Sequence, residues 1–245
     1  MQKNALLIGG TGGIGSAIVE KFLSNDMRVL ATYCKDSKKA EDMMSRLGHT
    51  NLEFFQLSLE DPQGIEKIMQ AIKEKYKLID AIVFSATLPI SHKQILDMDW
   101  QDFQRHLEVQ TKGMFYIAKN LSGQIKQKYK TKFIVILTEY CSGRPPKGFS
   151  DYITAKYSLM GLAKSMAAEF ARYNCTVNMI SPGMTETGLI AGLPAKLIEI
   201  TAENNPLKRI ARPEDIASTA LFLASDDSDY INGVNILVNG GDIMV

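Results

Sequence analysis

Apolar runs of strand length alternate with segments of helix length along nearly the whole chain of 245 residues. The strand candidates are apolar throughout rather than at every second position: "ALLIGG", "RVLATY", "LEFFQLSL", "IDAIVFSA", "KFIVILT", "CTVNMIS" and "GVNILVN". Strands of this kind are typical of a parallel sheet that is covered by helices on both faces. Because no linker or low-complexity stretch divides the chain, we expect a single domain over residues 1–245. Its predicted fold is a doubly wound α/β sheet of about seven parallel strands.

The segments between these runs have the periodicity of helices. They predict helices over residues 13–24, 37–47, 100–128, 151–173 and 213–224, and another after Pro62. The longest irregular region follows Pro182. In a doubly wound sheet, ligands bind beyond the carboxyl ends of the strands. The candidate site residues described below follow such strand ends, so we expect them to converge on one site.

Composition excludes several classes of protein. The chain has 28 Lys and Arg against 27 Asp and Glu, and this balance argues against a strongly basic nucleic-acid binder. No apolar run approaches the roughly 18 residues that span a membrane, and the start "MQKNALLIGG" does not resemble a signal peptide. The three cysteines (Cys34, Cys141 and Cys175) contain no CxxC pair and favour reduced thiols. We expect a cytoplasmic protein that binds neither nucleic acid nor membrane.

A glycine-rich turn, "IGGTGGIGSAIV", joins the first predicted strand to the first predicted helix. Gly9, Gly13 and Gly15 fit the spacing G-x3-G-x-G, while Gly10, Gly12 and Gly15 fit G-x-G-x-x-G. Glycines let the chain turn tightly and let a pyrophosphate approach the backbone and the helix N-terminus. The turn lacks the Lys-Ser/Thr pair of a nucleoside-triphosphate loop. It predicts a Rossmann-like dinucleotide site, and the alternative is a glycine turn without a ligand.

The end of the second predicted strand, "LATYCKDSKK", bears on the choice between the two nicotinamide dinucleotides. A carboxylate at this place holds the ribose hydroxyls of NAD and repels the extra phosphate of NADP. Here Tyr33 occupies the place of the acid, and Lys35 and two further lysines follow, although Asp36 lies in the loop beyond. The stretch favours NADP(H) over NAD(H). Lysines that only begin a solvated helix would be compatible with either cofactor.

A tyrosine and a lysine, Tyr152 and Lys156, lie four residues apart in "SDYITAKYS". On a helix this spacing puts both side chains on one face. An ammonium group beside a phenol lowers the pKa of the phenol and makes it a better proton exchanger near neutral pH. The pair therefore predicts a general acid, and the alternative is a surface pair without a catalytic role.

The glycine turn, the Tyr152-x3-Lys156 pair, "NMISPGMTET" and the tail "PLKRIARPEDIASTALFLASDDSDYINGVNILVNGG" occur together in one chain. Over its whole length this chain resembles the single-domain branch of the short-chain dehydrogenase/reductase family, and specifically its 3-oxoacyl-carrier-protein reductase-like members. The resemblance implies an NADPH-dependent oxidoreductase that reduces a carbonyl, either a 3-oxoacyl thioester or a similar hydrophobic ketone. Tyr152 would protonate the carbonyl oxygen, and Lys156 would bind the nicotinamide ribose. It further implies a place in fatty acid or polyketide biosynthesis.

The resemblance also implies which residues contact the cofactor. Ser58 and Leu59 would flank the adenine, and the segment from Pro182 to Thr187 would hold the nicotinamide end. The full set of implied cofactor contacts is Gly9, Thr11, Gly13, Ile14, Gly15, Tyr33, Cys34, Lys35, Ser58, Leu59, Ser85, Ala86, Tyr152, Lys156, Pro182, Gly183, Thr185 and Thr187. No metal site is expected.

Three positions depart from the family pattern and make the active site atypical. Glu139 stands thirteen residues before Tyr152, where the family usually has a serine, and Thr138 is its neighbour. Gln110 aligns with an asparagine that supports a proton relay, and "FSAT" replaces the usual "NNAG". An ionised carboxylate cannot donate a hydrogen bond to a carbonyl oxygen.

Several interpretations of Glu139 remain open at this stage. A protonated Glu139 would donate a hydrogen bond like the missing serine. Alternatively, Thr138 donates while Glu139 is turned away or paired with Lys156. The site would otherwise catalyse altered chemistry, such as dehydration or isomerisation, or the chain would be a binding-only or regulatory subunit. We expect a working reductase whose Glu139 lies near enough to affect the titration of Tyr152.

Residues 183–210 form a long connection that predicts a lid over the site. Its apolar residues favour an acyl or other hydrophobic substrate: Leu189, Ile190, Leu193, Leu197, Ile198 and Ile200. The alternative is a short amphipathic helix packed on its own domain.

Two further features concern partners. A run of cations would dock an acidic carrier protein, or would only form a solvated face: Lys126, Lys128, Lys130 and Lys132, with Arg172 later in the chain. The helix predicted over residues 151–173 is apolar on more than one face, which together with the apolar end "GGDIMV" favours a homodimer or homotetramer.

Overall fold

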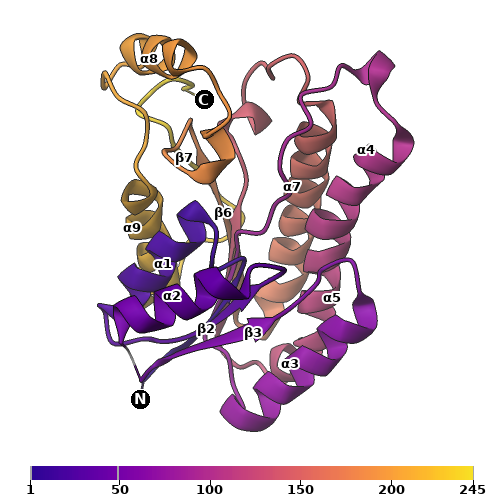
Figure 1. Cartoon of the computed structure of the whole chain (residues 1–245). Coiled ribbons are helices and arrows are strands. Elements are labelled where there is room, and N and C mark those ends of the chain that lie inside the picture. The colour runs from indigo at the N-terminus through magenta and orange to yellow at the C-terminus, as the bar shows by residue number, and fades with distance from the viewer. Residues whose placement is uncertain (1, 49, 245) are drawn as a thin grey trace.

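A computed structural model of the chain describes residues 2–48 and 50–244 (Figure 1). Its sheet has seven parallel strands in the order β3-β2-β1-β4-β5-β6-β7. The order reverses between β1 and β4, which marks the point where a doubly wound sheet binds its ligand. The predicted fold class is confirmed. The strands are β1 (Asn4–Ile8), β2 (Arg28–Tyr33), β3 (Leu52–Gln56), β4 (Ala81–Phe84), β5 (Thr131–Ile136), β6 (Cys175–Pro182) and β7 (Asn235–Val238).

Helices cover both faces of the sheet. In Figure 1 one layer contains α1 (Gly13–Leu23), α2 (Ser37–Leu47) and α9 (Pro213–Ala224). The opposite layer contains α3 (Pro62–Tyr76), α4 (Trp100–Leu107), α5 (Gly113–Asn120), α6 (Ser122–Lys126) and α7 (Ser150–Phe170). Short 3₁₀ turns lie at Ile95–Asp97, Glu139–Cys141, Ala171–Tyr173, Gly188–Ile190 and Asp226–Ser228.

Strand β1 shows why the strands are apolar throughout. Ala5 and Leu7 are buried on the side of α1 and α9, whereas Leu6 and Ile8 are buried on the side of α3 and α7. Successive side chains of a strand point to opposite faces, so a strand between two helical layers buries every residue. The two cores hold the carboxyl ends of the strands, and the loops that follow them, in fixed positions.

The long helix predicted over residues 100–128 is interrupted. A π-helical turn, Glu108–Lys112, separates α4 from α5, and α6 follows after Leu121. A π turn inserts one residue into the helical ladder, and such turns are frequent at functional sites. Gly113 follows the turn and packs against Leu59, whose Cβ would lie 3.0 Å from a Cβ at that glycine. Helix α7 begins one residue before the predicted start and ends in the 3₁₀ turn Ala171–Tyr173.

The connection after β6 extends beyond the carboxyl edge of the sheet and contains α8 (Ala195–Asn204). No residue of α8 is buried, and Leu197 and Ile200 are 43% and 41% exposed. A helix packed against its own domain would bury one face. The exposure of α8 therefore does not match the alternative of a short amphipathic helix packed on its own domain.

Candidate active site

The glycine turn between β1 and α1 is shaped for close backbone approach. Gly9 has φ +87°, and a Cβ there would lie 3.0 Å from the backbone of Ala86. A Cβ at Gly15 would lie 2.1 Å from the carbonyl oxygen of Gly9. Helix α1 begins after Gly12 without a side-chain cap and without an acidic residue in its first turn. Its first N–H groups are thus available to an anion such as a pyrophosphate.

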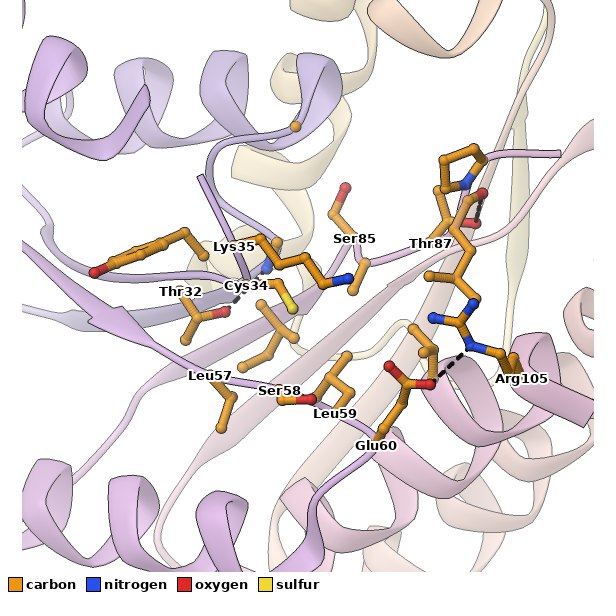
Figure 2. A pocket seen from close by; sticks show the side chains of 18 of the residues that line it. Thr32, Cys34, Lys35, Leu57, Ser58, Leu59, Glu60, Ser85, Thr87 and Arg105 are labelled. Atoms are coloured by element: carbon orange, nitrogen blue, oxygen red, sulfur yellow. Dashed lines mark hydrogen bonds and ion pairs between the residues drawn. The ribbon is translucent and has the colours of Figure 1, made fainter. Parts of the chain in front are cut away.

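A cavity of about 760 Å³ lies at the carboxyl ends of β1, β2, β3 and β4. This volume is in the range of cofactor sites. Half of the predicted cofactor contacts line the cavity: Gly9, Thr11, Tyr33, Cys34, Lys35, Ser58, Leu59, Ser85 and Ala86. Figure 2 shows the labelled side chains gathered around it from these separate loops. The switch point of the sheet and the cavity therefore coincide.

One end of the cavity is cationic. Lys35 and Lys39 both line it, and Figure 2 shows Lys35 projecting into the cavity. Asp36 lines it as well, but its carboxylate caps α2 by accepting from the backbone N–H of Lys39 at 3.1 Å. Asp36, the acid that favoured NAD, thus caps the start of a helix. Lys35 and Lys39 line the same end of the cavity, and Nζ of Lys39 lies 3.8 Å from Oδ2 of Asp36.

Leu57, Ser58 and Leu59 follow β3 and form one wall of the cavity, and Ser58 and Leu59 are the residues predicted to flank the adenine. Beside them Glu60 accepts a hydrogen bond from Nε of Arg105 at 3.0 Å. This ion pair joins the loop after β3 to α4 and closes one side of the cavity. Neither of its residues was predicted from the sequence.

The segment after β6 lies against the glycine turn. A Cβ at Gly13 would come within 2.5 Å of Thr187, so the two loops touch only because residue 13 is glycine. Thr185 donates to the carbonyl oxygen of Gly183 at 2.9 Å. The other half of the predicted cofactor contacts do not line the cavity itself: Gly13, Ile14, Gly15, Tyr152, Lys156, Pro182, Gly183, Thr185 and Thr187.

Tyr152 and Lys156 lie in the first two turns of α7 and are 7% and 2% exposed. The Nζ of Lys156 lies 5.6 Å from the centre of the Tyr152 ring and donates to the carbonyl oxygen of Ile136 at 2.8 Å. Burial lowers the pKa of Lys156 to about 8, so its ammonium form still predominates at pH 7. The surface-pair alternative is wrong, since both side chains are buried.

The pKa of Tyr152 is raised, against the expectation of a lowered one. Burial is the largest cause, and a hydrogen bond from Thr138 acts in the opposite direction. A phenol with a raised pKa stays protonated at neutral pH, which is the form that an acid needs before it donates. Thr138 is buried at the end of the segment that follows β5, and its hydroxyl faces the phenol.

Glu139 points elsewhere. It is 2% exposed, and its carboxyl faces Asn239 and the backbone of Met184. A Cβ at Gly183 would lie 3.3 Å from its Oε2, an oxygen that is buried without a hydrogen-bond partner. Burial raises the pKa of Glu139 to about 7, and the nearby Asp242 adds to the rise.

Of the interpretations open for Glu139, the geometry matches the turned-away carboxyl. Glu139 raises the pKa of its neighbour Tyr140, whereas the groups that shift the pKa of Tyr152 are Thr138, Cys141 and Tyr140. Glu139 is therefore not among the groups that shift the pKa of Tyr152, and its expected direct effect on that titration is absent. The Nζ of Lys156 donates to the carbonyl oxygen of Ile136, so the chain does not form the alternative Glu139–Lys156 pair.

The raised pKa of Glu139 predicts a pH-dependent stability. Its carboxyl stays protonated in the folded protein up to about pH 7 but ionises near its ordinary value of 4.5 in the unfolded chain. The folded state thus holds more protons between these values, and its stability falls as pH rises through this window. We expect Glu139→Gln to remove this fall. Compared with the parent, its free energy of unfolding should gain on the order of 1–3 kcal/mol between pH 4.5 and pH 8. Urea unfolding at both pH values measures it.

The control is Glu41→Gln, which changes an exposed carboxylate on α2. It should leave the pH dependence of unfolding as it is in the parent. Equal pH dependence in the parent and Glu139→Gln would contradict the buried, protonated carboxyl.

Gln110 lies in the π turn and is fully buried. Its Nε2 lies 3.5 Å from the hydroxyl of Thr87 and 3.4 Å from Nδ1 of His106, while its Oε1 has no partner. His106 and Asp151 are buried beside it, and the sequence analysis missed both. The sequence held one clue to Asp151. This aspartate stands directly before the candidate acid, at the start of a helix that otherwise carries little charge.

Known proteins resemble this chain over nearly its whole length. A family model described as enoyl-(acyl carrier protein) reductase matches residues 9–242. The chain is 30% identical over 243 residues to the 3-oxoacyl-[acyl-carrier-protein] reductase FabG of Buchnera aphidicola subsp. Baizongia pistaciae, covering 99% of this chain and 98% of that protein. It is 32% identical over 243 residues to FabG of Aquifex aeolicus, covering 98% and 96%.

Solved structures show the same likeness. The structure described as "ElxO Y152F with NADPH Bound" has a TM-score of 0.88 at 25% identity and covers 99% of both chains. A short-chain dehydrogenase/reductase of the glucose/ribitol dehydrogenase type from Brucella melitensis has a TM-score of 0.92 at 25% identity over 100% of both chains.

The chain therefore belongs to the short-chain dehydrogenase/reductase family. It is an NAD(P)-dependent short-chain oxidoreductase that resembles the 3-oxoacyl-acyl-carrier-protein reductases. Among the residues that the structure describes, no helix is both long enough and apolar enough to span a membrane.

Proposed function

We propose that this protein reduces a carbonyl with NADPH, and that its substrate is a 3-oxoacyl thioester or a similar hydrophobic ketone. The observation that carries the proposal is the buried group of Tyr152, Thr138 and Lys156 beyond the end of β5. A neutral phenol and a hydroxyl face each other there, beside an ammonium, and the carboxyl of Glu139 faces away from them. Dehydration or isomerisation through a Glu139 base would need that carboxyl in the same group.

The chain fits the cofactor. The uncapped first turn of α1 would hold the pyrophosphate, and the wall formed by Leu57, Ser58 and Leu59 would hold the adenine. Lys156, whose pKa of about 8 leaves it charged at pH 7, would hold the nicotinamide ribose. NADPH, when bound, supplies the hydride for the reduction.

The residues of the chain provide the proton. Thr138 would donate a hydrogen bond to the carbonyl oxygen and so stabilise the negative charge that develops there. Tyr152, protonated at neutral pH, would transfer its phenolic proton to that oxygen as the alcohol forms. The ammonium of Lys156, 5.6 Å from the phenol ring, would stabilise the phenolate that remains.

The cationic end of the cavity predicts the preference for NADPH. Lys35 and Lys39 both line it, so Lys35→Ala together with Lys39→Ala should weaken NADPH binding by about tenfold or more, since a hydrogen bond to a charged group contributes about 1.5–3 kcal/mol. Binding of NADH should change by less than about twofold, because it lacks the phosphate. Fluorescence titration of both cofactors measures the dissociation constants.

Lys38→Ala is the matched control, since Lys38 is exposed on α2 and does not line the cavity. Equal affinity of the parent for NADPH and NADH, or a parental preference for NADH, would contradict the assignment.

The segment of residues 183–210 would close over the substrate. Its helix α8 leaves Leu197 and Ile200 exposed beyond the carboxyl edge of the sheet, where an acyl chain can cover them. Because the FabG relatives are named 3-oxoacyl-[acyl-carrier-protein] reductases, a carrier-protein-bound 3-oxoacyl group is one of the substrates to test. Such a reaction belongs to fatty acid or polyketide biosynthesis.

The expected docking cations, apart from the exposed Lys128, divide into two sets. Lys130 and Lys132 pair with Asp226 and Asp229, at 2.9 Å for Lys130–Asp226 and 2.8 Å for Lys132–Asp229, so they are not free to dock a carrier. The other set, Lys126 and Arg172, lines a groove between α5 and α7 with Lys119 and the 48%-exposed Phe115. This groove would be covered by a second copy of the chain in a homodimer or homotetramer. The carrier protein would then dock near its cations.

The test is an assay of NADPH oxidation with 3-oxoacyl thioesters of increasing chain length and with small polar ketones as controls. We expect kcat/KM to rise with chain length. A protein that binds NADPH but oxidises it with none of these substrates would be a binding-only subunit, and the proposal would be wrong.

A further inference from the structure

The wall of the cofactor cavity nearest to α7 contains buried polar groups that the mechanism above does not use. Asp151 and His106 are 0% and 3% exposed, and both line the cavity together with Ser91. Asp151 directly precedes Tyr152 in the first turn of α7, while His106 belongs to the last turn of α4. Buried charges are costly unless they are paired, so the partners of Asp151 indicate what it holds in place.

The carboxylate of Asp151 joins three segments of the chain. Its Oδ1 accepts from the backbone N–H of Tyr152 at 2.7 Å, and its Oδ2 accepts from the hydroxyl of Ser91 at 2.8 Å. The same Oδ2 lies 3.6 Å from Nε2 of His106. The first turn of a helix has backbone N–H groups without intrahelical partners, and here one of them is held by this carboxylate.

His106 is fixed from both sides. Its Nδ1 lies 3.4 Å from Nε2 of Gln110, and its Nε2 lies 3.6 Å from Oδ2 of Asp151. The ring meets the ring of Tyr152 edge-on, with centroids 6.3 Å apart and planes at 86°. Phe149 meets Tyr152 at a similar separation, 6.3 Å and 82°. The phenol thus lies between two rings.

We propose that the Asp151–His106 pair positions Tyr152 for proton transfer. The pair holds the start of α7 against α4 and holds one of the two rings that confine the phenol. A misplacement of about 1 Å at a reacting group costs about 10²-fold in rate, so an acid in the first turn of a helix needs such support. This inference rests on the proposed function, since it assigns Asp151 and His106 a role only through Tyr152.

The test uses His106→Phe, which keeps the ring but removes both polar contacts, and His106→Gln, which can donate to Asp151 and accept from Gln110. We expect His106→Phe to lower kcat for a 3-oxoacyl thioester by about 10- to 100-fold, while KM and the NADPH dissociation constant change by less than about twofold. His106→Gln restores the polar contacts without the ring and should recover part of this loss. Asp151→Asn and Ser91→Ala carry the same test if His106→Phe does not fold.

The pH profile distinguishes positioning from a general loss of stability. Burial lowers the pKa of His106, and the carboxylate of Asp151 and the backbone carbonyl of Pro89 oppose this. The charges of Lys156 on α7 and Arg105 on α4 add to the lowering, and Asp102 also faces the ring from α4. Protonation in acid makes both ring nitrogens donors, so Nδ1 cannot accept from Nε2 of Gln110. We expect kcat of the parent to fall as pH falls below 6.5, and His106→Gln to lack this fall.

A double-variant comparison completes the experiment. In a Tyr152→Phe background, His106→Phe should lower the residual rate no further, because positioning acts through the phenol that is already missing. Equal kcat in the parent, His106→Phe and Asp151→Asn would overturn the positioning role while leaving Tyr152 as the acid. A Tyr152→Phe variant as active as the parent would overturn the proposed acid and this role with it.

Discussion

Replacing Tyr152 with phenylalanine is expected to lower kcat by about 10²- to 10⁴-fold, the range that a general acid contributes. The substitution removes only the phenolic oxygen and keeps the ring between Phe149 and His106. The dissociation constant for NADPH should change by less than about threefold, because Lys156 and the glycine turn remain. Steady-state oxidation of NADPH with a 3-oxoacyl thioester gives kcat, and fluorescence titration gives the dissociation constant.

The same helix offers a matched control. Tyr157 is 43% exposed, and its hydroxyl lies 3.4 Å from the carbonyl oxygen of Tyr140. Tyr157→Phe removes an equivalent oxygen five residues further along α7 and should leave kcat within about twofold, since surface substitutions usually have small effects. If the two variants behaved alike, Tyr152 would have no role as an acid.

Thr138→Val is expected to produce the second largest loss, about 10²- to 10³-fold in kcat, as the removal of one oxyanion donor does in other enzymes. Valine keeps the shape of threonine in a site that is only 6% exposed but cannot donate to the carbonyl oxygen or to Tyr152. Thr138→Ser restores the hydroxyl and should recover most of the rate. The neighbouring Glu139→Gln should stay within about threefold of the parent, because that carboxyl faces Asn239 rather than the phenol.

The opposite ranking would reverse the assignment. If Glu139→Gln abolished activity while Thr138→Val retained it, the carboxyl would be the catalytic group, and the site would have to rearrange to bring it to the substrate. Glu139→Ser adds a check. If this variant gained reductase activity, the parent would have to lack it.

The sequence predicted the frame of the site well. Strand β1 and the turn at Gly9 follow from a continuous apolar run and a glycine pattern, and both are local features. Helix α9 begins at Pro213 and ends at Ala224 as predicted, because proline at its first position and the cap from Asp215 mark its start. Tyr152 and Lys156 were found because four residues bring side chains to one face of a helix.

The sequence did not predict how side chains turn inside that frame. The direction of Glu139 depends on Gly183 and Asn239, which arrive from the ends of two other strands. The π turn at Gln110 inserts one residue into the helical ladder, and no local residue pattern marked it, so the sequence predicted one unbroken helix. The contact of Asp151 with His106 joins two helices distant in the sequence, and no spacing rule connects them.

The pKa of Tyr152 shows the same limit. Four residues of spacing predicted that Lys156 would lower it, but the outcome depends on burial, which is a property of the packed protein. Strands and helices on both sides exclude water from the phenol, and this raises its pKa more than Thr138 lowers it. Electrostatic predictions from sequence spacing alone miss this desolvation.

The most direct test of the central claim follows the hydride itself. The protein is incubated with a 3-oxoacyl thioester and NADPH that carries deuterium at both positions of C4 of the nicotinamide. The account predicts one deuterium at C3 of the 3-hydroxyacyl product for each NADPH consumed, with product formation slowed by about 10²-fold or more in Tyr152→Phe. A product without deuterium, or NADPH that is bound but never consumed, would contradict carbonyl reduction as the function of this protein.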